Sequence, residues 1–333
     1  MLLFLSALLA LAACGGTSTT TSNSPSAVNS PSAVASPSAT PLPVPTVAGT
    51  IAFQKVIDPS QGGNADICVV KTDGTGLKQL TDDPGVEERP AWSPDGRRIA
   101  YGGYPPGFMG PEDASIWIMN ADGSGKVRLT KGAVRGIYPS WSPDGKQIAF
   151  VRPFADGYRI FVMNADGSAL ARVTRPPSGG MAFAAVNDLF PTWLPNGKIV
   201  FLRTLQVFEV NPDGSGLRPL TKKGEGIVVF ALSLDGKRIA AYSPNNGSIS
   251  VIPTQGGGSS AALLESVSDL IPEAPNAAPA WASDGHALAL ASSSWVEHQQ
   301  AFGSRLYIVN DDGSGLSAVP GIDNAADPAW RPE

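Results

Sequence analysis

Residues that could carry out catalysis are scarce in this sequence. It contains two histidines, His286 and His298, and two cysteines, Cys14 and Cys68. No Cys or His cluster has the spacing of a zinc site, and the Gly-x-Ser-x-Gly elbow of a serine hydrolase does not occur. Cys68 lies in an apolar run and is expected to be a buried, inert thiol. The sequence therefore favours a protein without a catalytic centre, a cofactor or a metal.

The sequence around Cys14 indicates a covalent modification. Residues 1–13 are almost entirely apolar, too short to span a bilayer, and end in small residues directly before Cys14. This pattern resembles a bacterial lipobox, in which signal peptidase cleaves before the cysteine and its thiol carries a diacylglycerol. We predict a signal peptide over residues 1–13 and lipidation of Cys14. The alternatives are an ordinary signal peptide that contains a cysteine, or a start further upstream, because no Lys or Arg precedes the apolar segment.

The segment that follows is expected to be a tether. Residues 15–49 contain no charged residue and consist mainly of Ser, Thr, Pro and Ala. Such a segment cannot bury enough apolar surface to offset the entropy of ordering it. We therefore predict that residues 14–49 form a lipidated, disordered linker, which could reach about 100 Å if fully extended.

Asp-Gly pairs recur along the chain and could suggest calcium-binding loops. They begin at Asp73, Asp122, Asp166, Asp213 and Asp312. None of them carries the spaced acidic residues and the terminal Glu of an EF-hand loop. Asp and Gly are also the residues that close tight turns between strands. We interpret these pairs as turns.

A second recurring phrase sets the period of the chain. It reads Trp-Ser-Pro-Asp-Gly or a variant and begins at Trp92, Trp141, Trp193, Leu232, Trp281 and Trp330. The copies stand roughly 40 to 50 residues apart, the period of a propeller blade. Short β-branched and aromatic runs flank the turns and are typical of strands. One large apolar residue at the same place in every repeat is expected to pack between neighbouring sheets.

The repeats predict an all-β fold over residues 50–333, a six-bladed β-propeller with four antiparallel strands in each blade. Residues 50–81 supply only the last three strands of a blade, and residues 325–333 supply only the first. We expect these ends to pair, with residues 325–331 beside residues 51–55. Such closure removes the exposed sheet edges of an open array.

These phrases also resemble a known family. The Trp-Ser-Pro-Asp-Gly phrase, followed by Asn-x-Asp-Gly-Ser-Gly and then Leu-Thr, is similar to the repeat of the TolB-like β-propellers, over residues 50–333. The resemblance implies a six-bladed, extracytoplasmic propeller whose central channel mouth often binds a peptide or a protein. One departure is large, because TolB itself has an α/β domain before its propeller and this chain has no room for one.

The resemblance also suggests where a ligand binds. In TolB-like propellers the segment three residues before the Trp position enters the innermost strand near the channel mouth. In this chain that segment and the loops before it vary between repeats and combine both charge signs with two aromatic residues, as a peptide-binding rim does. The candidate residues are Glu87, Glu88, Arg89, Arg135, Tyr138, Asp188, Phe190 and Asp327. The alternative is a solvated rim without a ligand.

Composition limits the class of partner. The net charge of −5 gives no basic footprint for nucleic acid. We therefore predict a monomeric, non-catalytic binding or scaffold propeller, anchored by its lipid on the outer face of the cytoplasmic membrane or in the periplasm, whose partner is an envelope protein or peptide. The rival hypothesis is a propeller lyase or glycosidase acting on cell-envelope or plant polysaccharide. Such an enzyme would bring carboxylates, histidine or a metal together at the channel mouth.

Overall fold

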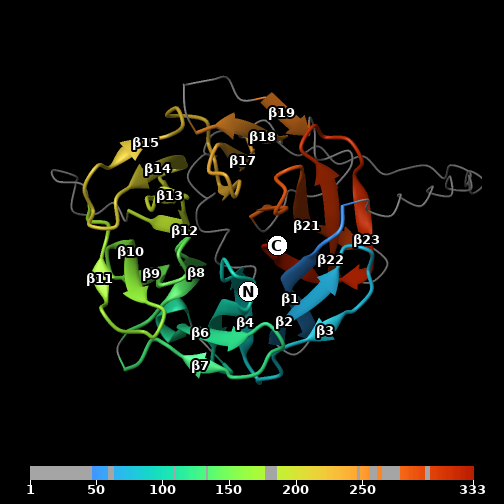
Figure 1. The fold of residues 1–333 in the computed structure, drawn as a ribbon, viewed down its shortest axis with the longest axis horizontal. Helices are drawn as coiled ribbons and strands as arrows, with labels where there is room; N and C mark the ends of the chain where they lie inside the picture. The colour runs from blue at the N-terminus through green and yellow to red at the C-terminus, as the bar shows by residue number, and fades with distance from the viewer. Residues whose placement is uncertain are drawn as a thin grey trace, which may run out of the picture. The chain divides into compact units, whose positions relative to one another are not determined.

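The described part of the chain is built almost entirely from β-strands (Figure 1). The computed structural model describes residues 47–58, 64–107, 110–132, 134–176, 186–245, 248–254, 261–264, 278–296 and 301–333. All of them belong to one structural unit, residues 42–333. The predicted signal peptide, Cys14 and nearly all of the predicted tether lie outside the described residues. Within the ranges above, no helix has the length and apolar character needed to cross a bilayer.

The strands form antiparallel groups of four that follow one another along the sequence. The first complete group contains β4 (Val86–Trp92), β5 (Arg98–Tyr104), β6 (Ser115–Asn120) and β7 (Val127–Arg128). The next contains β8 (Ile137–Trp141), β9 (Gln147–Phe154), β10 (Gly157–Asn164) and β11 (Ala171–Arg172). A third contains β12 (Asp188–Trp193), β13 (Ile199–Arg203), β14 (Gln206–Val210) and β15 (Arg218–Pro219). A short 3-10 helix, Pro111–Asp113, precedes β6.

Two more groups complete the second half of the chain. One contains β16 (Val229–Leu232), β17 (Arg238–Ser243), β18 (Ser248–Pro253) and β19 (Ala261–Leu264). The other contains β20 (Ala280–Trp281), β21 (Ala287–Val296), β22 (Ala301–Asn310) and β23 (Ser317–Asp323). The prediction of an all-β fold made of four-stranded antiparallel sheets is confirmed.

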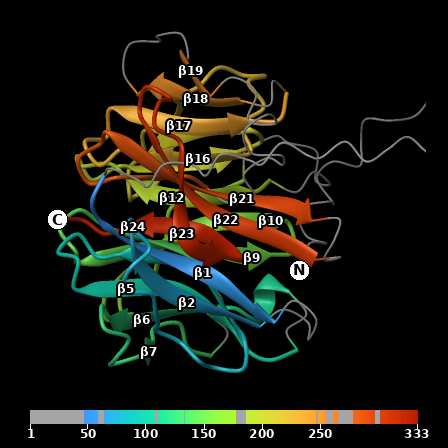
Figure 2. The ribbon, with the colours of Figure 1, turned by 90° about the vertical axis from the view of Figure 1, so that its right-hand side faces the viewer.

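The remaining strands come from both ends of the described chain. Strand β1 (Thr50–Asp58) pairs with β2 (Asn64–Lys71), which pairs with β3 (Lys78–Gln79). On its other side β1 pairs antiparallel with β24 (Ala325–Trp330), with Ile51 opposite Trp330 and Lys55 opposite Ala325 (Figure 2). A single parallel pairing of Ala65 with Val86 joins this group to the β4–β7 group.

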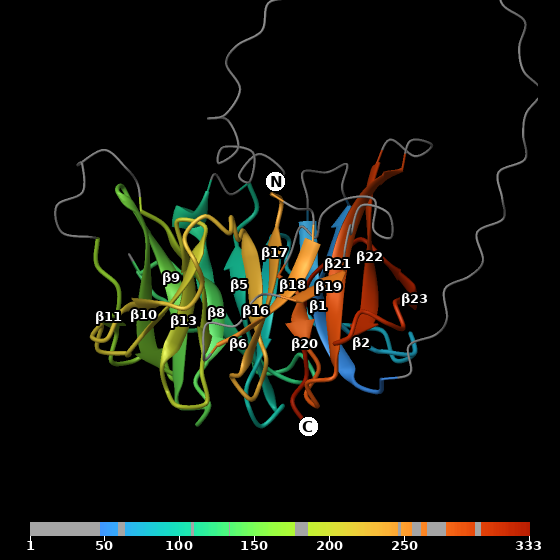
Figure 3. The same cartoon turned by 90° about the horizontal axis from the view of Figure 1, so that it is seen from above.

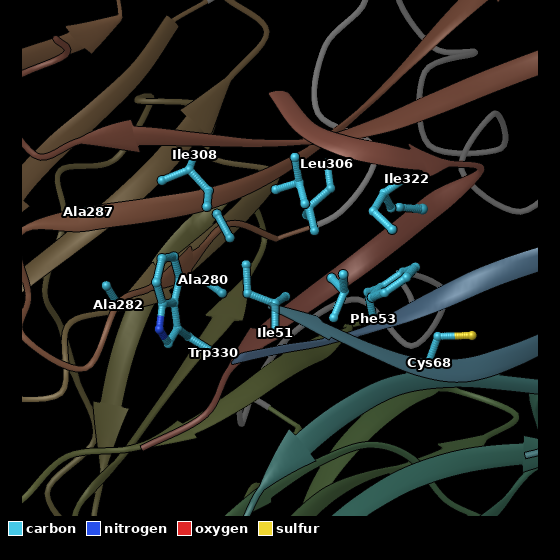
Figure 4. Close-up of a cluster of buried hydrophobic side chains, with 14 residues drawn as sticks. Ile51, Phe53, Cys68, Ala280, Ala282, Ala287, Leu306, Ile308, Ile322 and Trp330 are labelled. Carbon is cyan, nitrogen blue, oxygen red and sulfur yellow. The ribbon is translucent and has the colours of Figure 1, made fainter. Parts of the chain in front are cut away.

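A buried apolar cluster holds the two ends of the described chain together (Figure 4). Ile51 and Phe53 from β1 pack with Leu306 from β22 and with Trp330 from β24. Cys68 belongs to the same cluster, and burial raises the pKa of its thiol to about 11. The expected burial of Cys68 is confirmed, and the raised pKa of its thiol is consistent with the prediction that it is unreactive.

The turns use the side chains that the sequence singles out. In the Asp-Gly turns an Asp carboxylate accepts a hydrogen bond from the backbone N–H two residues later, as Asp122 Oδ1 does from Ser124 N at 2.9 Å. The following Gly123 has a φ of 89°, a conformation that residues with a Cβ rarely adopt. In the Leu-Thr phrases the threonine hydroxyl accepts a backbone N–H of a neighbouring strand, as Thr130 Oγ1 does from Ile116 N at 3.0 Å. The repeated phrases therefore terminate strands.

The first strand of each group contacts the first strand of the next group. The contacts run from β4 to β8, β12, β16, β20 and β24, and β24 contacts β4. Strands β4, β8 and β12 lie toward the middle of Figure 1. Seen at right angles to that view, the strands run roughly along one common direction (Figure 3). We call these six strands the inner strands.

The repeated tryptophans connect neighbouring inner strands. All are buried, and four indole N–H groups donate to a backbone carbonyl of the preceding group. These pairs are Trp92 to Ala329, Trp141 to Ala91, Trp193 to Ser140 and Trp281 to Ala231, at 3.1 to 3.2 Å. Leu232 occupies the same position, and its side chain carries no donor. The predicted packing role of the repeated residue is confirmed.

Trp141 provides a test of this connection. Its indole packs in the core beneath the guanidinium of Arg98, whose Cζ lies 4.5 Å from the ring centroid. Trp141→Ala should lower the free energy of unfolding by about 3 to 5 kcal/mol, because it removes a large buried aromatic side chain. Trp141→Phe should lower it by only about 1 to 3 kcal/mol, mainly through the carbonyl of Ala91 left without its donor. Urea denaturation measures both. An unchanged stability of Trp141→Phe would contradict the proposed role of the indole N–H, and equal effects of the two substitutions would contradict the packing role of the ring.

Candidate functional site

Four inner strands contain a residue with left-handed backbone at the same place in the repeat. Arg89, Tyr138, Phe190 and Asp327 each stand three residues before the Trp position and have φ angles between 48° and 57°. This conformation is uncommon for residues other than glycine and costs about 1 to 3 kcal/mol when it is held. At each of these residues the register with the adjacent strand shifts, as in a β-bulge. The bulge changes the direction in which the side chain points.

The side chains of these four residues meet. Arg89 Nη1 lies 3.1 Å from Asp327 Oδ1. The Cζ atom of Arg89 lies 4.6 Å from the ring centroid of Tyr138 and 4.8 Å from that of Phe190. The two rings stack on each other with their centroids 5.0 Å apart. The neighbouring Glu88 accepts a hydrogen bond from the Tyr104 hydroxyl at 2.9 Å. We call Glu88, Arg89, Tyr138, Phe190 and Asp327 the central cluster.

Burial controls the charge of the central cluster. The Arg89 side chain is 17% exposed and that of Asp327 is 9% exposed. Burial raises the pKa of Glu88 to about 7, while the positive charge of Arg89 opposes this rise. Burial also raises the pKa of the Asp327 carboxyl, again against the effect of Arg89. Arg89 therefore pairs with Asp327 and also acts through its charge on Glu88, whose pKa lies near neutral pH.

The other three predicted site residues do not join the central cluster. Asp188 is fully buried and forms a two-pronged ion pair with Arg203, at 2.5 and 2.8 Å. Glu87 is also buried, and Arg135 donates to the carbonyl of Gly132 at 2.7 Å. Glu87 and Asp188 stand two residues before a bulge, where simple alternation would give them the same face as Arg89 and Phe190. The bulge breaks this alternation.

Glu87 and Arg135 instead line a cleft beside the β4–β7 sheet. We call it the lateral cleft, and its volume is about 720 Å³. Burial raises the pKa of Glu87 to about 8, and the adjacent Asp66 carboxyl adds to the rise.

Asp66 and Tyr104 were not predicted as site residues. Tyr104 stands opposite Val86 at the end of β5, two residues from Gly102, the partner of Glu88, so only the pairing of β4 with β5 identifies it.

In the ranges that the structure describes, no group of three or more His, Cys, Asp or Glu residues is placed to hold a metal ion. The Asp carboxylates of the Asp-Gly turns accept hydrogen bonds within their own turns, as predicted from the turn interpretation.

Comparison with known proteins agrees with this architecture. Residues 136–333 match the TolB beta propeller domain. The chain belongs to this family. No curated protein sequence matches it. Among solved structures, TolB from Acinetobacter baumannii superimposes with a TM-score of 0.68 at 20% sequence identity, covering 86% of this chain and 67% of that chain.

Two further structures share the fold with this TolB-type propeller. A chain of the nidogen/laminin complex has a TM-score of 0.62 at 11% identity and covers 86% of this chain and 98% of its own. Hydrazine synthase of Kuenenia stuttgartiensis has a TM-score of 0.59 at 16% identity and covers 86% of this chain and 47% of its own. At such identities the similarity establishes the fold alone, and function must be argued from the site.

The raised pKa of Glu88 predicts a specific pH dependence of stability for this TolB-type propeller. Its ordinary value is 4.5, so the folded protein binds an extra proton between about pH 4.5 and 7, and stability falls as the pH rises through this range. Glu88→Gln should flatten the fall between pH 5 and 7. Urea denaturation at pH 5, 6, 7 and 8 measures it.

The matched control is Glu87→Gln, which leaves Glu88 intact. The pKa of Glu87 is raised from 4.5 to about 8, so this variant should flatten the curve from about pH 5 to 8, one pH unit further than Glu88→Gln. Parallel curves for the wild type and Glu88→Gln would show that Glu88 is not held in the buried position described here.

Proposed function

We propose that this protein is a lipid-anchored, extracytoplasmic binding module whose six-bladed propeller captures a peptide segment of another envelope protein at the central cluster. The pairing of β24 with β1 and the run of contacts from β4 through β24 back to β4 support a ring of six blades closed by both ends of the domain. The match to the TolB beta propeller domain is consistent with this reading.

The central cluster is the observation that carries the proposal. Backbone strain at non-glycine residues persists only where the surrounding structure fixes it, and it concentrates at functional sites. Here the four strained residues are an arginine, two stacked aromatic residues and an aspartate, and their side chains contact one another. Aromatic residues and arginine are the side chains that dominate binding energy at protein interfaces.

The chemistry of the central cluster suits a peptide. The rings of Tyr138 and Phe190 offer apolar faces, and Glu88 and Asp327 offer acceptors for backbone or terminal N–H groups. Because the single guanidinium of Arg89 acts on two carboxyl groups, a ligand that brings N–H donors compensates the excess of acceptors. A bound peptide would have to interact with Arg89 where it lies between Asp327 and the rings.

An enzyme is the second candidate, and one observation favours it. The pKa of Glu88, raised to about 7, suits a group that transfers protons near neutral pH. The nearby Asp327 would then serve as a second carboxylate in a lyase or glycosidase. We favour binding because Glu88 accepts from Tyr104 and Asp327 forms an ion pair with Arg89, so each carboxyl group is held by a neighbouring side chain. Release of reducing ends from cell-envelope or pectic polysaccharide by the purified protein, lost in Glu88→Gln, would favour the enzyme.

The lipid anchor is tested at Cys14. Cys14→Ser should move the protein from the membrane fraction to the soluble fraction and abolish incorporation of labelled palmitate, because the substitution removes the only thiol in the lipobox-like sequence. Cys68→Ser is the matched control and should remain membrane-bound. Retention of Cys14→Ser on membranes after a high-salt wash would contradict the anchor.

Binding at the central cluster is tested by site-specific photo-crosslinking in cells. A benzoylphenylalanine in place of Tyr138 should form an ultraviolet-dependent adduct with one envelope protein, because position 138 lies within the proposed contact. The same group in place of Leu234, a residue 52% exposed and outside the cluster, is the control. The proposal fails if position 138 gives no adduct, or if both positions give the same adducts.

A further inference from the structure

One sheet contains a complete internal binding site for an arginine side chain. In the β12–β15 sheet, Asp188 stands directly opposite Arg203 on the next strand and pairs with it. The guanidinium lies over two rings, with Cζ 5.2 Å from the centroid of Phe201 and 5.9 Å from that of Phe208. An inner-strand carboxylate and an aromatic pair thus hold the arginine in a buried position.

The β4–β7 sheet contains the same parts without the arginine. Glu87 is five residues before Trp92, as Asp188 is before Trp193, and it stands opposite Gly103. Tyr101 and Trp117 pair across β5 and β6 as Phe201 and Phe208 do across β13 and β14, and their rings stack 6.5 Å apart. Gly103 therefore occupies the position of Arg203.

The Glu87 carboxyl group interacts with Thr81 and Asp66 but has no arginine partner in the described part of the chain. Glu87 is 4% exposed, and its Oε2 has no hydrogen-bond partner among the described residues. The lateral cleft opens at this point and is lined by Glu87, Tyr101, Gly103 and Trp117. A buried, unpaired carboxyl oxygen is unfavourable, and a cation placed beside it would remove the penalty.

The positive side chains that line the lateral cleft interact with groups other than the Glu87 carboxyl. Lys126 forms ion pairs with Asp82 and Asp83 at 3.3 and 3.4 Å. Arg128 Nε donates to the carbonyl of Thr130, and Arg135 donates to that of Gly132. The carboxyl groups that line the cleft are those of Asp83, Glu87 and Asp113, and the Asp66 carboxyl lies beside that of Glu87.

We propose that the lateral cleft binds the guanidinium group of an arginine side chain supplied by a peptide or protein partner. The guanidinium occupies the space above Gly103, pairs with the Glu87 carboxylate and stacks on Trp117, as Arg203 does with Asp188 and Phe208. This site differs from the central cluster in its binding residues, although Tyr104, which lines the cleft, donates to Glu88 of that cluster. The proposal does not depend on the function assigned to the central cluster.

The direct test uses the full chain in detergent and a short synthetic peptide. Acetyl-Gly-Arg-Gly-amide should bind at least about tenfold more tightly than the same peptide with citrulline, a neutral group of nearly the same shape. Glu87→Gln should abolish this preference. Binding of the arginine peptide should also tighten between pH 6.5 and 8.5, because Glu87 must lose its proton. Equal binding of the two peptides, or a preference for arginine that survives in Glu87→Gln, would overturn the proposal.

A second test introduces an arginine side chain into the lateral cleft by substitution of Gly103. A Cβ at position 103 would lie 2.9 Å from the ring of Trp117, so Gly103→Arg is combined with Trp117→Phe, which reproduces the Arg203 and Phe208 arrangement. The double variant should unfold at a higher temperature than Trp117→Phe alone and should lose binding of the arginine peptide. Tyr138→Ala, in the central cluster, should bind the arginine peptide as the wild type does. Unchanged binding by the double variant, or its loss in Tyr138→Ala, would contradict a separate lateral site.

Discussion

The left-handed backbone of one residue in four inner strands is the constraint on which the geometry of both sites depends. It shifts the register at that residue and turns the side chains of Arg89, Tyr138, Phe190 and Asp327 toward one another. The same bulge leaves the residues two positions earlier on the sheet faces, where Glu87 lines the lateral cleft and Asp188 pairs with Arg203. Three residues later a buried Trp side chain packs against the neighbouring sheet. The shifted register on one side and the packed Trp side chain on the other thus hold each of these residues in its left-handed conformation.

The repeated phrases made most of the fold predictable from sequence, because each phrase has a local physical reason. Asp and Gly close turns, Thr hydroxyls accept a neighbouring N–H, and Trp fills the space between sheets. Arg89, Tyr138, Phe190 and Asp327 could be selected as one set, because they stand at the same place in the repeat and differ in kind. That the side chains of these four residues contact one another could be seen only in the structure.

What sequence could not provide was the direction of each side chain around the bulge. Counting in twos along a strand groups Glu87 with Arg89 and Asp188 with Phe190, and this grouping fails where a left-handed residue interrupts the alternation. The ion pair of Asp188 with Arg203 depends on cross-strand register, which emerges only when strands are paired. The same register relates Gly103 to Arg203, so the comparison of the two sheets required the structure.

A double-mutant cycle between Arg89 and Asp327 tests the central claim most directly, because the ion pair of these two residues joins β4 to β24 within the central cluster. The free energy of unfolding is measured for the wild type, Arg89→Met, Asp327→Asn and the double variant. We expect each single substitution to destabilise the protein. The double variant should be less destabilised than the sum of the two single variants by a coupling energy of about 1 to 3 kcal/mol, because either substitution alone already removes the buried ion pair. A coupling within about 0.3 kcal/mol of zero would contradict the contact, and with it the central cluster and the proposed closure of the ring through β24.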